Sequence, residues 1–488
     1  LMKQLKDLLY RVNIEAVTGS TAIDINKIEF DSRKITDGDV FVAIVGTQAD
    51  GHQYIPTAVR NGVRAIICEQ LPDDIQENVT YVQVGNSNEA LAFMAANYYD
   101  NPSENLKLVG VTGTNGKTTV TSLLYQLFKR AGYKVGLLST VKVLVDEVAY
   151  EATHTTPDSL SINAYLKKMN DVGVEFCFME ASSHGIHQKR TAGLKFEGAI
   201  FTNLSHDHLD YHKTFAAYRD AKKELFDQLP KSAFSLVNTD DKNGLVMLQN
   251  TKSRKFTYAL KGYADYRVKV LENQFSGLLL KINEHEVWTK LVGDFNAYNI
   301  LAIYAASDLL GLPEEDSLRI ISELDSVSGR FQYLIGDNGI TAVVDYAHTP
   351  DALQNVLQTI NAIRTQNESL ITVVGCGGDR DAQKRPEMGK IAASLSSQVI
   401  FTSDNPRTED PKKIIDQMEA GVEPQDYKKI LAITDREQAI KTACKMANPN
   451  DIILIAGKGH EDYQEINGVR THFNDFEKVS QLLSDDKD

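Results

Sequence analysis

Short apolar runs alternate with helical patterns along most of this chain. In the central part, such runs occur at 106–111, 135–138, 176–179, 199–202 and 235–237. These runs are mostly apolar and do not alternate regularly in polarity, which is typical of parallel strands that are buried on both faces of a sheet. The pattern therefore predicts an α/β fold in which helices cover both sides of a parallel sheet.

The same alternation appears near both ends of the sequence. Before about residue 105, the pattern predicts strands at 41–45 and 65–68, with a helix beginning near residue 54. After residue 330, it predicts two helices over 351–363 and 436–446 and a larger set of strands. The expected strands are 342–344, 371–374, 399–401, 430–433 and 452–455. This arrangement is typical of a second, Rossmann-like doubly wound unit.

Residues 255–292 follow a different pattern. Their apolar runs are shorter and alternate with polar residues, as in Gly277–Ile282, which predicts an antiparallel insertion. A helix from Ala297 to Leu310 is expected to follow. With a linker at Asn101–Glu104, we expect three domains, at 1–105, 106–329 and 330–488, the central one an ATP-binding phosphate-loop domain.

Composition narrows the class of protein. A length of 488 residues agrees with about three domains, and the net charge of −14 disfavours a generic nucleic-acid binder. No apolar run approaches the roughly 20 residues that span a bilayer, and the N-terminal segment is a short amphipathic pattern and not a signal peptide. We therefore expect a cytoplasmic protein without a membrane span. The four single cysteines are expected to be reduced core residues: Cys68, Cys177, Cys376 and Cys444.

The strongest chemical signal is a glycine loop that follows one apolar run and opens a helical pattern over 119–128. Such a loop holds phosphates with its backbone N–H groups and the helix N-terminus, while Lys117 reaches the terminal phosphates and Thr118 can meet Mg²⁺. Five residues separate Gly110 from Gly116, where the usual motif has four. The residues expected at the nucleotide are Gly113, Thr114, Asn115, Gly116, Lys117, Thr118 and Thr119. The loop predicts that the chain binds ATP or a close relative of it.

Two further strand ends carry possible metal ligands. Glu180 follows one apolar run, and His208 lies in the histidine-rich segment after another. A carboxylate oxygen and an imidazole nitrogen near phosphates suit Mg²⁺, although the histidine-rich turn could alternatively bind a transition metal.

Lys222 lies on the apolar face of an expected helix over 215–229. The residues on its face, at positions −7, −4, +4 and +7, are Phe215, Tyr218, Phe226 and Leu229. Lys223 shares a different face with Arg219 and Asp227, which we expect to face solvent. A lysine on a buried face must extend to solvent, find an anion or lose its charge. The helical pattern alone leaves these three outcomes open.

Four strand ends in the last third also carry glycines and charges, as ligand-facing loops do. They are Asp345–His348, Gly375–Arg380, Ser403–Arg407 and Ala456–Glu461. These motifs, together with others earlier in the chain, resemble those of the Mur ligases. The earlier motifs are Asp31-Ser-Arg33, the phosphate loop, Thr155-Thr-Pro157, Glu180–His184, the DHLDYH segment and GDFNAYN at 293–299. Those enzymes add amino acids in bacterial cell-wall (peptidoglycan) synthesis with ATP. The resemblance runs nearly end to end and is greatest to the members that make UDP-N-acetylmuramoyl-tripeptide.

The resemblance implies roles for individual residues. It assigns Lys117, Thr118, Glu180 and His208 to ATP and Mg²⁺, and it makes Lys222 a carbamylated lysine whose carbamate binds Mg²⁺. It places Asn296 and Asn299 near adenine and makes Arg330 and Asp345 interdomain nucleotide contacts. The residues implied to hold the UDP-muramoyl-dipeptide are Ser32, Thr47, Gln48, Thr155, Thr156, Ser182, Gln188 and Arg190. The chain departs from the family at Gln332, often glutamate, at Ser328, usually proline, and at Thr47, histidine in some relatives.

The same resemblance implies a reaction. A substrate carboxylate attacks the γ-phosphate of ATP, and an amine then attacks the acyl phosphate. The implied substrates are UDP-MurNAc-L-Ala-D-Glu and meso-diaminopimelate. Arg407 could receive the second carboxylate that lysine lacks. The implied amine pocket consists of Arg380, Asp404, Asn405, Arg407, Gly457 and Glu461.

Other functions are weighed against this one. An enzyme that adds L-lysine fits if Arg407 only caps a turn, whereas a sister ligase that adds a different residue is disfavoured by the Asp404-Asn-Pro-Arg407 motif. A phosphate-loop kinase or GTPase would explain the loop, but it would not explain Lys222 or the second sheet. A non-catalytic nucleotide-binding regulator would need no metal ligands and no amine pocket. Small molecules are the expected partners, and a monomer is the expected state.

Overall fold

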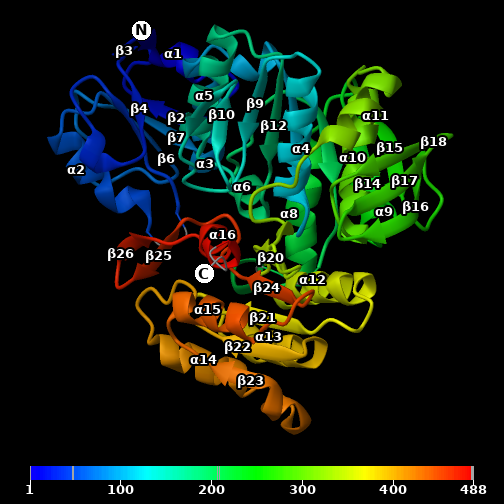
Figure 1. The fold of residues 1–488 in the computed structure, drawn as a ribbon. Helices are drawn as coiled ribbons and strands as arrows, with labels where there is room; N and C mark the ends of the chain where they lie inside the picture. Colours follow the sequence, from blue (N-terminus) through cyan, green and yellow to red (C-terminus); the bar gives the residue numbers. More distant parts are fainter. Residues whose placement is uncertain (1, 47–48, 206, 208, 485–488) are drawn as a thin grey trace. The chain divides into compact units, whose positions relative to one another are not determined.

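A computed structural model describes residues 2–46, 49–205, 207 and 209–484 of the chain, which forms two compact units (Figure 1). Unit 1 comprises Leu1–Gly113, Leu124–Thr202 and Ala216–Thr257. Unit 2 comprises Thr114–Leu123, Asn203–Phe215 and Tyr258–Asp488. The phosphate loop therefore groups with the C-terminal part of the chain.

The first sheet of unit 1 is built from the N-terminal region. Its order is β2-β7-β6-β5-β4, and all neighbours are parallel except β2 and β7. The strands are β2 (Ile14–Thr18), β4 (Ile28–Glu29), β5 (Val40–Val42), β6 (Ala65–Cys68) and β7 (Thr80–Val84). Ala65 and Ile67 of β6 enter one core while Ile66 and Cys68 enter another. Both faces are therefore buried, which explains the continuous apolar run. The expected strand at 65–68 is confirmed, whereas the one expected at 41–45 ends at Val42.

The second sheet of unit 1 confirms the predicted parallel architecture. Its strands run in the order β11-β10-β9-β12-β8-β13-β14, and β9, β12, β8, β13 and β14 are mutually parallel. Their bounds are β8 (Lys107–Thr112), β9 (Val135–Leu138), β10 (Val143–Val145), β11 (Val148–Tyr150), β12 (Phe176–Glu180), β13 (Phe196–Phe201) and β14 (Phe234–Asn238). In the register, Glu180 pairs with Val111 and Phe201 with Thr112. The carboxyl ends of β12 and β13 thus lie level with that of β8, the strand that leads into the phosphate loop.

Helices flank these strands close to their expected positions. In unit 1 they include α2 (Ile55–Arg60), α3 (Ser87–Tyr98), α5 (Ser159–Asp171), α6 (Ser183–His187) and α8 (Phe215–Asp227). Helix α4 (Lys117–Arg130) begins two residues before the expected position. Its first turn closes early because Gly116, at φ 87°, turns the chain and accepts the Val120 N–H at 2.8 Å.

The predicted antiparallel insertion is partly confirmed. Strands β16 (Tyr266–Gln274), β17 (Gly277–Ile282) and β18 (His285–Thr289) are antiparallel neighbours. Strand β15 (Arg254–Ala259), however, pairs with β16 in parallel, so the prediction is wrong for this pair. Helices α10 (Asp294–Leu309) and α11 (Glu314–Glu323) follow the insertion.

The last sheet of unit 2 confirms the predicted doubly wound fold. Its order is β19-β20-β24-β21-β22-β23, and only β19 is antiparallel to its neighbour. The strands are β19 (Gln332–Ile335), β20 (Thr341–Asp345), β21 (Leu370–Val374), β22 (Gln398–Phe401), β23 (Ile430–Ala432) and β24 (Ile452–Ala456).

Helices cover both faces of that sheet. Helices α12 (Pro350–Ile363), α13 (Lys384–Leu395) and α14 (Pro411–Glu419) pack into one core, and α15 (Arg436–Met446) and α16 (Asp475–Ser484) pack into the other (Figure 1). A hairpin of β25 (Tyr463–Ile466) and β26 (Val469–His472) precedes α16. In β20, β22 and β24, the buried side chains of adjacent residues enter opposite cores, as in a sheet between two helical layers.

All four cysteines are unbridged, and three of them are buried. Within the described part of the chain, no helix combines the length and apolarity that a membrane crossing requires.

Candidate active site

The phosphate loop of unit 2 is held by its own backbone and by the segment after Phe201. The Thr114 N–H donates to the Asn203 carbonyl at 2.8 Å, and the Asn115 N–H donates to Asn203 Oδ1 at 2.9 Å. Lys117, the first residue of α4, folds back so that its Nζ donates to the Thr114 carbonyl at 2.8 Å. A lysine thus lies at the mouth of a glycine loop at a helix N-terminus, the arrangement that binds terminal phosphates.

Arg330 lies beside this loop, and Asp345 lies close to Arg330 in the same unit. Arg330 donates from Nη2 to Thr118 Oγ1 at 3.1 Å and stacks over the Tyr346 ring at 4.6 Å. Asp345, at the end of β20, accepts the Phe331 N–H at 2.7 Å. Burial raises the pKa of Asp345 to about 6, although Arg330 opposes this shift. These contacts bring a cation from the C-terminal region to the hydroxyl expected at Mg²⁺.

Asp351 is a further residue at the loop that the motifs did not identify. Its Oδ2 accepts the Asn115 side-chain amide at 3.0 Å and the Ser205 hydroxyl at 2.9 Å. It lies in the first turn of α12, where sequence reasoning placed only a helix. Its place shortly after the charged end of β20 was the available signal.

Asn296 and Asn299 form a buried pair at the start of α10. Asn296 donates to the Val292 carbonyl at 2.8 Å, and Asn299 donates to Asn296 Oδ1 at 3.0 Å. Within the described residues, no hydrogen bond joins this pair to the phosphate loop, so the adenine role stays a prediction.

Glu180 provides a fixed carboxylate at the end of β12 in unit 1. It is fully buried, and its carboxylate accepts the Thr140 N–H at 2.7 Å and the Thr140 hydroxyl at 3.2 Å. Thr112, at the end of β8, and Ser183 are buried too, and their hydroxyl oxygens have no protein partner among the described residues. The Glu180 carboxylate is a hard oxygen donor of the kind that Mg²⁺ prefers. No group of three or more His, Cys, Asp or Glu suited to a metal occurs among the residues that the structure describes.

Lys222 is buried, as its position on the helix predicted. Its side chain is 1% exposed, donates to the Gly113 carbonyl at 2.9 Å and lies over the Tyr218 ring at 4.7 Å. It therefore does not extend to solvent, and it reaches the first residue of the phosphate-loop motif. The expectation that Lys223 faces solvent is wrong, because Asp227 at 2.7 Å and Asn250 at 2.6 Å satisfy its ammonium group and allow it to be buried.

Five of the residues implied to hold the UDP substrate come together next to Glu180. The Thr156 hydroxyl donates to the Glu180 carbonyl at 2.8 Å and to Ser182 Oγ at 3.0 Å. Arg190 donates to the Thr156 carbonyl and to Gln188 Oε1, both at 2.6 Å, while Thr155 accepts the Thr140 hydroxyl. Two threonine side chains, one serine, one glutamine and one guanidinium thus lie near the end of β12.

Among the described residues, no hydrogen bond joins Ser32, a further residue implied to hold this substrate, to the cluster. Ser32 is buried in the first region, where its carbonyl accepts the Asn61 amide at 3.0 Å. Thr47, Gln48 and His208 lie outside the described residues.

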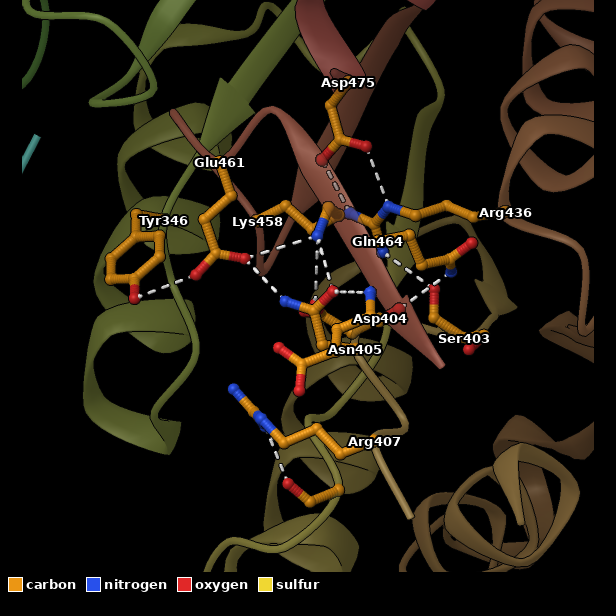
Figure 2. A network of polar contacts seen from close by, with 12 residues as sticks. Tyr346, Ser403, Asp404, Asn405, Arg407, Arg436, Lys458, Glu461, Gln464 and Asp475 are labelled. Atoms are coloured by element: carbon orange, nitrogen blue, oxygen red, sulfur yellow. Dashed lines mark hydrogen bonds and ion pairs between the residues drawn. The ribbon is translucent and has the colours of Figure 1, made fainter. Parts of the chain in front are cut away.

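The implied amine pocket is a polar network at the carboxyl ends of β22 and β24 (Figure 2). Asn405 donates to Glu461 Oε2 at 2.8 Å, and Asp404 lies beside Gly457, where a Cβ atom would approach Asp404 Oδ2 to 2.5 Å. At φ 118°, Gly457 also has a backbone conformation that favours glycine. Arg407 donates to the Gly378 carbonyl at 2.7 Å, while Arg380 is exposed and donates to the Asp379 carbonyl.

Sequence reasoning missed two supports of this pocket. Arg436 and Asp475 form a fully buried bidentate pair at 2.7 and 2.8 Å (Figure 2). Arg385 is also buried, bonds both oxygens of Glu409 and donates to the Gly377 carbonyl at 3.1 Å, which links two of the pocket loops. Each pair joins positions more than twenty residues apart, so no local pattern indicates it.

We expect the protein to lose stability in acid because of two histidines at this site. Burial, followed by the Lys384 ammonium, lowers the pKa of His348 to about 4, and burial, followed by Arg330, lowers the pKa of His460 to about 3. Both must gain a proton on unfolding below about pH 6.5, so their stabilisation is lost as the pH falls from there. Asp345, with its raised pKa, acts in the opposite direction between about pH 6 and 4, but two histidines outweigh one carboxyl group.

Urea titrations should therefore show an unfolding free energy lower by about 3 kcal/mol at pH 4.5 than at pH 7. In His460→Gln, the unfolding free energy should fall less between pH 7 and pH 4.5, because glutamine gains no proton on unfolding. In the wild type, Nδ1 of His460 is buried without a partner among the described residues. Equal acid sensitivity of the variant and the wild type would contradict this origin.

Comparison with known proteins agrees with this geometry. Residues 24–99 match the family described as "Mur ligase family, catalytic domain", 111–307 match "Mur ligase middle domain", and 329–459 match "Mur ligase, glutamate ligase domain". A Bacteroides fragilis protein named UDP-N-acetylmuramoyl-L-alanyl-D-glutamate--2,6-diaminopimelate ligase is 52% identical over 481 residues, which cover 99% of each chain.

Two further relatives carry the same name. The Bacteroides thetaiotaomicron protein is 51% identical over 480 residues, which cover 98% of this chain and 100% of the relative. A solved structure of an enzyme with that name has a TM-score of 0.69 at 32% identity and covers 99% of both chains. The three-domain α/β fold, the phosphate loop and these matches lead to one conclusion: the chain belongs to the Mur ligase family.

Proposed function

We propose that this chain is an ATP-dependent ligase that joins meso-diaminopimelate to UDP-N-acetylmuramoyl-L-alanyl-D-glutamate, releasing ADP and phosphate. The observation that carries the proposal is the presence of one guanidinium, Arg407, and two acids, Asp404 and Glu461, in the loops that follow β22 and β24. A zwitterionic amino-acid end needs this combination of charges. The name of the 52% identical relative supports the same substrates.

Each of the three domains binds a different substrate. Residues 1–105 bind the UDP end of the substrate, 106–329 bind ATP, and 330–488 bind the incoming amino acid. The small-molecule substrates are the only partners the proposal requires, and it places a monomeric enzyme in the cytoplasm.

Residues of the central and C-terminal domains bind ATP and offset the charge of its phosphates. The phosphate loop and Lys117 bind the phosphates, and Arg330, which already bonds Thr118, adds a second cation beside them. Thr118, Glu180, His208 and a carbamate on Lys222 would hold Mg²⁺, which neutralises charge on the transferring phosphoryl group. Asn296 and Asn299 contact the adenine ring, and Asp345 orients Arg330.

Two transfers then make the amide bond. An oxygen of the D-glutamate side-chain carboxylate attacks the γ-phosphorus, the bond to the β-phosphate oxygen breaks, and ADP leaves. The cluster of Thr155, Thr156, Ser182 and Arg190 holds this substrate through its hydroxyl and guanidinium donors. The amine nitrogen then attacks the acyl carbon, loses a proton, and expels inorganic phosphate. Exclusion of water preserves the acyl phosphate for the amine.

Arg407→Ala should raise the KM for meso-diaminopimelate about 100-fold, because a charged hydrogen-bonded contact worth about 3 kcal/mol is lost. The KM values for ATP and the UDP substrate should be unchanged, and the preference over L-lysine should shrink by a similar factor. Steady-state assays with each amine measure this. The control is Arg319→Ala, which removes an arginine from a surface pair with Glu323 on α11. An unchanged preference would contradict the assignment of Arg407.

The proposed function is tested by measuring phosphate release from ATP with single substrates left out. Release should require both the UDP-muramoyl-dipeptide and the amino acid, and meso-diaminopimelate should be used in preference to L-lysine. Release that continues unchanged without the amino acid would contradict ligase activity. Equal use of the two amines would contradict the specificity alone.

A further inference from the structure

Lys458 is a fully buried lysine at the centre of the amine pocket, and the motif comparison gave it no role. Its Nζ lies 3.1 Å from Asn405 Oδ1, 3.3 Å from Glu461 Oε2 and 3.7 Å from Asp404 Oδ1 (Figure 2). Its side chain is 0% exposed. It therefore cannot be a surface lysine that happens to lie near two acids.

The charges around Lys458 explain why it is buried. Asp404 and Glu461 have side chains only 8% and 17% exposed, so two carboxylates share a poorly hydrated space. Two such groups cannot both remain ionised unless a cation lies close to both. With Lys458 the three groups carry a net charge of about −1, which a substrate ammonium group would neutralise.

Lys458 also determines which way the Asn405 amide faces. Asn405 Oδ1 accepts hydrogen bonds from Lys458 Nζ and from the Glu465 N–H at 2.9 Å, so the amide nitrogen must point toward Glu461. Lys458 and Asn405 then both contact Oε2 of Glu461. Among the described residues, Oε1 of Glu461 accepts one long hydrogen bond, at 3.4 Å from the Tyr346 hydroxyl. One carboxylate oxygen thus remains available to accept a bond from a ligand.

We propose that Lys458 is a positioning residue for amine recognition, which balances the charge of the adjacent Asp404 and Glu461 side chains and aims Oε1 of Glu461 at the distal ammonium group of the substrate. The inference rests on the proposed function and adds to it. Lys458 itself does not touch the amine, because its donors are already directed at Asn405, Asp404 and Glu461.

The pH dependence of amine binding follows from this arrangement. Burial and the neighbouring Asp404 carboxylate raise the pKa of Glu461, and Lys458 opposes that rise. Besides Asp404 and Lys458, the titratable or charged groups that act on this carboxylate are Tyr346, Arg436 and Tyr463. Arg436 is already neutralised by Asp475. Without Lys458, the pKa of Glu461 should rise further, and its attraction for an ammonium group should weaken as the pH falls.

The test measures kcat/KM for meso-diaminopimelate from pH 6 to 9.5 in the full-length wild type and in Lys458→Met. In Lys458→Met, the pH below which kcat/KM falls (the acidic limb of the profile) should be higher than in the wild type by at least about one pH unit. The reason is that an opposite charge at this distance shifts a carboxyl pKa by 1–3 units. On the acidic side, kcat/KM should therefore be about tenfold lower than in the wild type, and it should largely recover at high pH. The KM values for ATP and the UDP-muramoyl-dipeptide should stay within about twofold of wild type.

A second variant keeps the proposal testable if Lys458→Met does not fold. Asp404→Asn removes the neighbouring negative charge and leaves Lys458 in place, so the acidic limb should move downward even if kcat/KM falls overall. In the double variant Lys458→Met, Glu461→Gln the limb should disappear, since the titrating carboxyl is gone. The matched control is Lys390→Met, which removes a surface lysine that pairs with Glu423.

The outcomes separate this inference from the proposed function. If the wild type uses meso-diaminopimelate but Lys458→Met lowers kcat/KM equally at every pH, Lys458 has only a structural role and the inference is wrong. An unmoved limb in Asp404→Asn would overturn it as well. If the wild type does not use meso-diaminopimelate at all, the proposed function itself fails.

Discussion

Lys117→Met should reduce kcat about a thousandfold while changing the KM for the UDP substrate little. The ammonium group of Lys117 lies at the mouth of the phosphate loop, where its Nζ donates to the Thr114 carbonyl at 2.8 Å. There it can meet the charge that develops as the γ-phosphoryl group is transferred. Removing one preorganised donor at such a position typically costs about 10²–10³-fold in kcat. Methionine keeps the length of the side chain and lacks its charge.

ADP release with all three substrates, at saturating ATP and Mg²⁺, measures this effect. The matched control is Lys129→Met, which removes a lysine from the same helix that pairs with Asp146 at 2.6 Å. The control should keep near wild-type kcat. A Lys117→Met enzyme within about tenfold of wild type would show that the terminal phosphates lie elsewhere.

Lys222→Met should lower activity at least about a hundredfold and raise the Mg²⁺ concentration needed for half-maximal rate. Lys222 is buried against Gly113, and a carbamate formed there from CO₂ would supply an anionic oxygen ligand for Mg²⁺. Methionine would fill the same space without a ligand. Carbon-13 NMR of enzyme equilibrated with ¹³CO₂ should show a carbamate resonance in the wild type and none in Lys222→Met.

Lys223→Met is the control for this experiment. It removes the adjacent buried lysine, which pairs with Asp227 and Asn250, and should cost stability without changing the Mg²⁺ dependence. If Lys222→Met showed the Mg²⁺ dependence of the wild type, Lys222 would not contribute a metal ligand.

The strands of the parallel sheets could be predicted from the sequence because many of them are buried on both faces. Runs such as 135–138 and 65–68 appear as the same strands, β9 and β6, since neither face meets solvent. The pairing direction of β15 and β16 could not be predicted, because polarity along one strand does not determine which way its neighbour runs. Helix α4 began early because Gly116 closes the first turn, a backbone effect that the apolar pattern does not report.

Some features of the candidate site could likewise be predicted from the sequence, and others could not. Helical spacing alone placed Lys222 on a buried face, and motif positions placed Arg330, Thr156 and Arg190 among polar contacts. The error at Lys223 arose because burial of a lysine depends on its partners and not only on the face it occupies. Lys458, Asp351 and the Arg385–Glu409 pair depend on contacts between distant segments, and no local spacing reveals such contacts.

The central claim is that ATP phosphorylates the substrate carboxylate before the amine arrives. UDP-muramoyl-dipeptide labelled with ¹⁸O in its D-glutamate side-chain carboxylate tests this most directly, by mass spectrometry of the phosphate released during turnover with meso-diaminopimelate. The account predicts one ¹⁸O atom in each phosphate, because the carboxylate oxygen that attacks the γ-phosphorus leaves with it. Phosphate without label would contradict the account, since no acyl phosphate would then have formed.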